Sequence, residues 1–191
     1  MSKVSTNSQY KGDVTLKLKL KNKTIELKKK NKGLLTLSRA FALYISNNTD
    51  KDNYTPQFLD LQWLEYPSQV SNIENLSNWE SFLLQPISIS GLSYKLEERA
   101  YVEQGQSRYQ PNWVAVATAR IPYSYLISHQ TVSSTSLFRL FLLTKEFDNT
   151  TLDRRLCYVP ITADEINKMT PGSELQVEWN LQLVHAPIET E

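Results

Sequence analysis

Near its C-terminal end the chain reads Leu175-Gln176-Val177-Glu178-Trp179-Asn180-Leu181-Gln182-Leu183, a strict alternation of apolar and polar side chains. Side chains of a β-strand point alternately to its two faces, so this pattern predicts a strand with one face on a core and the other on water or a partner. The preceding Pro171-Gly172 predicts a turn into the strand. We therefore expect a mainly β protein built around this segment.

A short helix is predicted just before that turn, near residues 163–169. Thr162-Ala163-Asp164-Glu165 has the spacing of a capping box, in which Thr162 accepts from the amide of Glu165 and Glu165 returns to the amide of Thr162. A second helix is predicted near residues 35–46, where apolar side chains recur at helical spacing. These side chains are Leu34, Leu37, Phe41, Tyr44 and Ile45.

Most of the remaining chain consists of strand-like segments separated by polar loops. The predicted strands are 14–20, 24–28, 58–66, 82–90, 92–96, 113–121, 137–144 and 155–160. Pro86 interrupts one of them, which a central strand would not accept. Residues 137–144 are apolar apart from Arg139, which predicts a strand buried on both faces. The chain has no fixed sequence repeat. This series of strands therefore predicts a two-sheet antiparallel β-sandwich, jelly-roll-like, that also contains the predicted helices near 35–46 and 163–169.

Length and composition favour one folded domain. The chain has 191 residues, of which 40% are hydrophobic, enough to bury a single core. Residues 1–10 are polar and predict a flexible N-terminal arm, which leaves 11–191 as a single β-sandwich domain. The same ten residues lack the apolar segment of a secretory signal, so we do not expect secretion by a signal peptide. No run of 18 apolar residues occurs, and we expect no membrane span.

The residue types that usually carry catalysis or bind metals are sparse. Cys157 is the only cysteine, which excludes an intramolecular disulfide and predicts a buried, inert thiol. His129 and His185 show no ligand-like spacing, so no metal site is expected. A pairing of His129 with Ser128, Ser133 or Ser134 is possible on paper, but no Gly-x-Ser-x-Gly elbow accompanies it.

Phosphate-binding and paired-carboxylate motifs give no stronger indication. The chain has neither Gly-x-Gly-x-x-Gly nor Gly-x-x-x-x-Gly-Lys, and so no glycine cradle for a nucleotide. The pair Glu97-Glu98 is interpreted as the solvated end of a strand. Asp164-Glu165 is interpreted as helix capping, because negative charge suits a helix N-terminus. We therefore expect a protein that is not an enzyme and that carries no cofactor.

The charge of the chain is unevenly distributed. Nine lysines lie between Lys11 and Lys32 against Asp13 and Glu26, a local charge of +7. Of the totals of 21 basic and 20 acidic residues, 12 and 18 remain elsewhere, which gives −6. The apolar–polar alternation on both sides of Lys21-Asn22-Lys23 predicts a hairpin, so residues 11–32 form a basic N-terminal hairpin.

The basic hairpin allows three interpretations. It could follow a nucleic-acid backbone, but between Lys11 and Lys32 there is neither an aromatic residue to stack on bases nor an arginine. It could be an edge hairpin kept soluble by lysine, which also blocks stray strand pairing. It could also dock on an acidic protein surface. We favour the last two interpretations over nucleic acid. The predicted interface residues are Lys17, Lys19, Lys28, Lys29 and Lys30.

Three groups of segments at the two ends of the chain carry a resemblance. They are Lys11–Leu18, Asn31-Lys32-Gly33 with its predicted helix to Ile45, and Ile161–Ile166 with Thr170-Pro171-Gly172 and Val177-Glu178-Trp179. Together they resemble small β-sandwich virion proteins of tailed bacteriophages, of the kind found in tails, necks and baseplates. The resemblance implies a non-enzymatic structural subunit of the virion, present in several copies. Its partners would be copies of itself, as a homo-oligomer, and other virion proteins.

A carbohydrate- or ligand-binding β-sandwich module is the alternative hypothesis. Aromatic side chains on loops could stack on sugar rings, although the same side chains could belong to the core. The candidates are Tyr101, Tyr109, Trp113, Tyr123 and Tyr125. The mass in solution separates the two hypotheses, since a ring-sized species indicates assembly and a glycan-binding monomer indicates a binding module.

Overall fold

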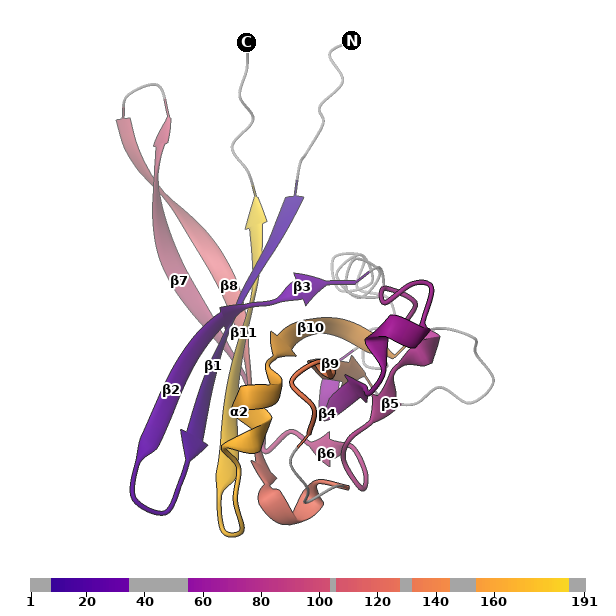
Figure 1. The fold of residues 1–191 in the computed structure, drawn as a ribbon. Helices are drawn as coiled ribbons and strands as arrows, with labels where there is room; N and C mark the ends of the chain where they lie inside the picture. Colours follow the sequence, from indigo (N-terminus) through magenta and orange to yellow (C-terminus); the bar gives the residue numbers. More distant parts are fainter. Residues whose placement is uncertain (1–7, 35–54, 104–105, 128–131, 145–153, 186–191) are drawn as a thin grey trace.

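The computed structural model describes residues 8–34, 55–103, 106–127, 132–144 and 154–185. Its first sheet consists of β1 (Ser8–Lys19), β2 (Thr24–Lys30), β7 (Gly91–Glu103), β8 (Gln106–Pro122) and β11 (Glu174–His185). Its second sheet consists of β3 (Lys32–Gly33), β4 (Pro56–Leu64), β5 (Glu80–Ser81), β6 (Ile87–Ser88), β9 (Leu137–Thr144) and β10 (Arg155–Ile161). The two antiparallel sheets pack face to face, which confirms the predicted β-sandwich (Figure 1).

The strand pairs are nested, from the two ends of the described chain inward to the consecutive strands β7 and β8. β1 pairs with β11 along its whole length, β3 with β10, β4 with β9 and β7 with β8, all antiparallel. The first sheet has the order β2-β1-β11-β8-β7 and the second the order β3-β10-β9-β4-β5, with β6 also paired to β4. β11, which carries the strict alternation of apolar and polar residues, thus lies in the middle of the first sheet.

The core lies between the two sheets. In β11 the alternation predicted from the sequence is confirmed, since Leu175, Val177, Trp179 and Leu181 are buried. Trp179 is completely buried and belongs to the same cluster as Leu16 of β1. The second sheet and the segments beside it contribute an aromatic group, in which Phe82 lies 4.9 Å from Trp63 and 5.1 Å from Phe138 between ring centroids.

The other face of the second sheet is also covered. A smaller apolar cluster contains Phe141, Leu143 and Tyr158, and Leu76 packs against it. Leu76 belongs to η3 (Leu76–Asn78), one of two short 3₁₀ turns between β4 and β5, the other being η2 (Pro67–Gln69). Seven of the eight residues of β9 are buried, so the strand predicted to be buried on both faces is confirmed.

The chain passes from the first sheet to the second at Asn31. Its backbone N–H donates to the carbonyl oxygen of Gly12 at 3.0 Å, directly between β2 and β3. Gly12 is buried, and a Cβ at this position would collide with the Asn31 side chain. A glycine is therefore required here for close approach.

Three local predictions differ from the structure or lie outside it. The arm was predicted over residues 1–10, but β1 begins at Ser8, because the backbone of Ser8–Tyr10 pairs with the end of β11. Segment 82–90 is not one strand. β5 ends at Ser81, just before the segment, and β6 occupies only Ile87–Ser88, directly after Pro86. The helix near 35–46 lies outside the described residues.

The short helix is confirmed, although it ends earlier than predicted. It is α2 (Ala163–Asn167), and its N-terminus carries both hydrogen bonds of the capping box. Thr162 Oγ1 accepts from the Glu165 amide at 3.2 Å, and the Thr162 amide donates to Glu165 Oε2 at 2.8 Å. No helix in the described part of the chain is long and apolar enough to span a membrane.

β7 and β8 continue as a two-stranded ribbon that diverges from β1 and β11 (Figure 1). The pairing of β8 with β11 ends at Gln182↔Val114, whereas the pairing of β8 with β7 continues to Glu103↔Gln106. The carbonyl of Thr118 faces β7, because it accepts from the Ser90 amide. By alternation, the backbone groups of Pro111 face the β11 side, where proline has no N–H to donate. Pro111 thus explains why the ladder with β11 stops.

Candidate functional site

Among the side chains that the structure describes, the first sheet presents four exposed lysines on its outer face. Lys17 and Lys19 of β1 alternate with the buried Leu16 and Leu18, so they point away from the core. Lys28 and Lys30 of β2 lie on the same outer face, opposite Thr15 and Asp13 in the register. We call Lys17, Lys19, Lys28 and Lys30 the lysine face.

Four carboxylates lie on the same outer face as the lysine face. Glu26 Oε2 lies 3.7 Å from the Nζ of Lys17, and its Oε1 lies 3.9 Å from that of Lys28. Asp13 is the register partner of Lys30, and Glu174 of β11 is that of Lys19. Glu178 of β11 lies opposite Thr15 on the same face. Exposed pairs of this kind contribute only about 0–1 kcal/mol each, so they leave Lys28 and Lys30, on the edge strand β2, available to a partner carboxylate.

Lys29, predicted to belong to the same surface, points the other way. Its Nζ donates to Glu165 Oε2 at 2.6 Å and to the carbonyl oxygen of Pro160 at 2.9 Å. The side chains of Lys29 and Glu165 are each only 17% exposed. Consecutive residues of a strand face opposite sides, so Lys28, Lys29 and Lys30 cannot share one surface. Lys29 is thus a structural residue that connects β2 to the capping box of α2.

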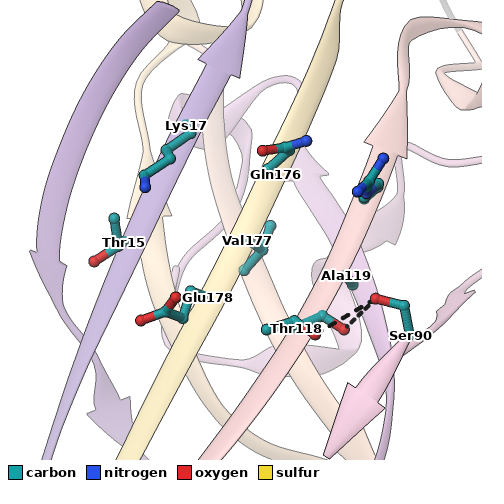
Figure 2. Close-up of a pocket in the computed structure, with 9 residues that line it drawn as sticks. Thr15, Lys17, Ser90, Thr118, Ala119, Gln176, Val177 and Glu178 are labelled. Carbon is teal, nitrogen blue, oxygen red and sulfur yellow. Dashed lines mark hydrogen bonds between the residues drawn. The ribbon is translucent and has the colours of Figure 1, made fainter.

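A shallow hollow of about 300 Å³ lies beside the lysine face, on the outer face of the first sheet (Figure 2). It is lined by Thr15, Lys17, Ser90, Thr118, Ala119, Arg120, Gln176, Val177 and Glu178. One side is fixed by Ser90, whose Oγ donates to the carbonyl oxygen of Thr118 at 3.0 Å. The lining offers hydrogen-bond donors, acceptors and both charges, but its nine residues include no aromatic ring on which a sugar could stack.

The five aromatic candidates do not come together in one place. Tyr123 and Tyr125 lie in η4 (Tyr123–Tyr125), where both are partly buried against the core. Tyr101, Tyr109 and Trp113 stand on strands rather than loops, and their side chains lie outside the described part. Trp113, which is nearer to Tyr123 along β8 than Tyr109 is, lies nine residues before Pro122, about 30 Å at ~3.3 Å per residue. The two aromatic groups therefore cannot form one site within this chain.

Cys157 is buried, as predicted from the sequence. Burial raises the pKa of its thiol to about 12, although a hydrogen bond with the Asn31 side chain acts in the opposite direction. A thiol with this pKa is protonated at neutral pH and is a poor nucleophile. Cys157 therefore serves as a small core residue.

The other candidates for chemistry remain scattered. His129 lies outside the described residues, and His185 is the last residue of β11. Ser133 Oγ lies 2.8 Å from the hydroxyl of Thr135, a local turn contact. Glu97 and Glu98 lie within β7. Among the described residues, no three His, Cys, Asp or Glu side chains lie close enough together to hold a metal ion.

A buried polar group on the outer side of the second sheet was not predicted. The Arg139 guanidinium lies between the rings of Trp79 and Tyr158, 4.3 Å from each centroid, and its Nη2 donates to Glu74 Oε1 at 2.8 Å. Nearby, Asp60 accepts from Ser81 Oγ at 2.6 Å and from Gln62 Nε2 at 2.7 Å.

This polar group has a structural explanation. Glu74 and Trp79 belong to the segment between β4 and β5, so Arg139 holds that segment against the sheet. Burial is the largest influence on the Asp60 carboxyl and raises its pKa, although Ser81, Gln62, Arg155 and Arg154 act in the opposite direction. The sequence signal was the single arginine in an apolar strand.

Comparison with protein-family models, with curated proteins and with solved structures gives no match for this chain.

Proposed function

We propose that the protein is a non-enzymatic structural subunit of a bacteriophage virion, of the tail, neck or baseplate type. It would be present in several copies and dock on acidic surfaces of its own copies and of other virion proteins. The observation that carries the docking role is the lysine face, four exposed lysines on one side of an edge hairpin. The virion class is supported by the resemblance alone.

Exposed ion pairs alone are too weak to hold such an interface together. Exposed ion pairs contribute about 0–1 kcal/mol each, so several must act together with buried apolar area. A stable interface buries about 1,200–2,000 Å² in total. Exposed charges are screened beyond about 8–10 Å near physiological ionic strength, so we expect assembly to weaken as salt increases.

Charge reversal on the lysine face tests the docking role. The variant Lys17→Glu/Lys19→Glu/Lys28→Glu leaves Lys29 and its ion pair intact. A control with the same change in net charge reverses Lys21, Lys23 and Lys168, which are exposed but outside the lysine face. Sedimentation velocity and particle reconstitution at low and high salt should show assembly of the wild type and the control but not of the lysine-face variant.

Two outcomes would contradict this proposal. Equal assembly of the lysine-face variant and the wild type at every salt would make the lysines a solubilising edge only. Binding of the wild type to duplex DNA with a steep salt dependence would instead make nucleic acid the partner. The virion class is tested separately by the neighbouring genes, where a phage structural cassette is expected.

A ligand-binding module remains the second candidate because of the polar hollow in Figure 2. Its lining resembles a site for a small polar ligand rather than a stacked sugar, since hydrogen-bonding groups of Gln176, Glu178 and Arg120 surround it. A glycan array and a screen of small polar molecules test this function, with Gln176→Ala as the binding-deficient variant. A monomer that binds a glycan would favour this candidate over assembly.

A further inference from the structure

Among the described residues, no strand pairs with the outer edge of β2, and the backbone groups along this edge can be assigned from the register. The Leu20 amide donates to the Lys23 carbonyl, and the Asn31 amide donates to the Gly12 carbonyl. Both pairs belong to the β1–β2 register, so alternation of an antiparallel ladder directs residues 25, 27 and 29 toward β1. The backbone N–H and C=O groups of Thr24, Glu26, Lys28 and Lys30 therefore face outward.

The opposite edge of the same sheet is β7. Among the described residues no strand lies beyond it, and its 13 residues contain no proline. The Thr118 carbonyl faces β7 and Gly91 is its register partner, so Gly91 and every second residue after it bond to β8. The backbone groups of the even-numbered residues from Leu92 to Val102 consequently face outward.

The two edges differ in charge. On β2, Lys29 is already paired with Glu165, so Lys28, Lys30 and Glu26 leave a net charge of +1. β7 has three glutamates against one lysine and one arginine, a net charge of −1. Pairing of β2 with another β2 would bring together two strands of net positive charge, which is unfavourable. Charge thus disfavours a contact between two β2 strands and favours β7 as the partner of β2.

We propose that β2 of one copy pairs with β7 of the next, so that the first sheet continues from copy to copy. The proposal rests on the assembly function proposed above and specifies its contact between copies. All neighbours in the five-stranded sheet are antiparallel, so β2 and β7 run in the same direction. Copies repeated in one orientation therefore join by a parallel pair. Such a head-to-tail contact closes into a ring or continues as a filament.

Proline at an outward position tests the pairing itself. Lys28→Pro removes an N–H that faces the open edge and leaves the bonds of β2 to β1 in place. Lys28→Gln removes the same charge but keeps the N–H, so the difference between the two variants isolates the backbone bond. The reciprocal pair on β7 is Glu98→Pro and Glu98→Gln. Thermal unfolding shows that each variant is folded.

Sedimentation velocity of each variant gives the strength of self-association. Each proline variant should associate about tenfold more weakly than its glutamine control, since one lost hydrogen bond is worth about a factor of ten. Equal association of folded proline and glutamine variants would overturn strand pairing, while the lysine face could still be an interface. A wild type that stays monomeric at its highest soluble concentration would overturn the contact between copies.

Cysteine cross-linking identifies which edges meet. Cys157 is buried, so a new exposed cysteine is the reactive one in the folded protein. Glu26→Cys on β2 and Ser93→Cys on β7, which are both exposed on the outer face of the first sheet, are mixed and oxidised under mild conditions. Mixed dimers are the expected product. Cross-linking of each variant only with itself would overturn the head-to-tail contact.

Discussion

At the scale of single residues, Lys29 is the lysine of the hairpin on which stability should depend. Lys29→Met keeps the aliphatic stem but leaves Glu165 without its cation. We expect a loss of about 1.5–3 kcal/mol in the free energy of unfolding, because a hydrogen bond to a charged group is removed from a largely buried site. Urea denaturation monitored by tryptophan fluorescence measures this loss.

Lys28→Met provides the matched control, since the Lys28 side chain is 79% exposed. A surface substitution of this kind changes stability by less than about 0.5 kcal/mol. If both variants unfold at the same urea concentration as the wild type, the Lys29–Glu165 pair contributes nothing to stability. The sequence contained the signal for this difference, because Lys29 follows Ile25 and Leu27 at the spacing of one strand face.

Asp60 gives a prediction about pH. Burial raises the pKa of its carboxyl in the native state, so the native protein binds this proton more tightly than the unfolded chain does. The ionised form then costs stability at neutral pH, and that cost disappears as pH falls through the native pKa toward the unfolded value of about 3.9. Lowering the pH should therefore favour the wild type relative to Asp60→Asn.

Urea unfolding of both proteins between pH 7 and pH 4 measures this difference. The stability of the wild type minus that of Asp60→Asn should increase steadily on acidification. A difference that is constant, or that decreases, would mean that the hydrogen bonds from Ser81 and Gln62 outweigh burial.

At the scale of elements, the crossing between the sheets should tolerate no added atom. Gly12→Ala places a Cβ against the Asn31 side chain, and we expect it to cost about 1–3 kcal/mol, as overpacking in a dense region does. Thermal unfolding measures the loss. Adding Asn31→Ala should recover part of it by making room. A double variant no more stable than Gly12→Ala would show that the collision is not the cause.

An element could be predicted from the sequence when its pattern lies within consecutive residues. α2 and β11 have complete signals in consecutive residues, a capping box and a strict alternation. β5 and β6 do not, because each has two residues and is defined only by its pairing with β4. The ion pair of Arg139 with Glu74 was equally invisible, since 65 residues separate the partners.

At the scale of the whole molecule, Trp179 tests whether the two sheets share one core. Trp179→Ala should cost about 3–5 kcal/mol, because it removes the largest fully buried side chain. Trp179→Phe should cost less, since Nε1 has no hydrogen-bond partner among the described residues. Denaturant unfolding followed by circular dichroism measures both. Unchanged stability of Trp179→Ala would remove β11 from the core.

The lysine face and the strand order illustrate the limits of the sequence at this scale. The basic hairpin was predicted from local charge and from the alternation of apolar and polar residues. Four of its five predicted interface lysines lie on one exposed surface in the structure. The pairing of β1 with β11 has no local signal, because their register joins residues on opposite ends of the chain. The backbone hydrogen bonds between β1 and β11 depend on strand geometry rather than on residue type. The pairing of these two strands therefore cannot be predicted from the residues of either strand.

The position of β11 between β1 and β8 also sets an order of events during synthesis. The first sheet cannot close until β11 has left the ribosome, 155 residues after the end of β1, counted from Lys19 to Glu174. At about 5–20 residues per second this delay is on the order of 8–31 s. During that time the hairpin lacks its neighbour β11, and its lysines disfavour pairing with the like-charged hairpin of another nascent chain. The lysines that we propose for docking in the folded protein would thus act earlier, during synthesis, by disfavouring contacts between nascent chains.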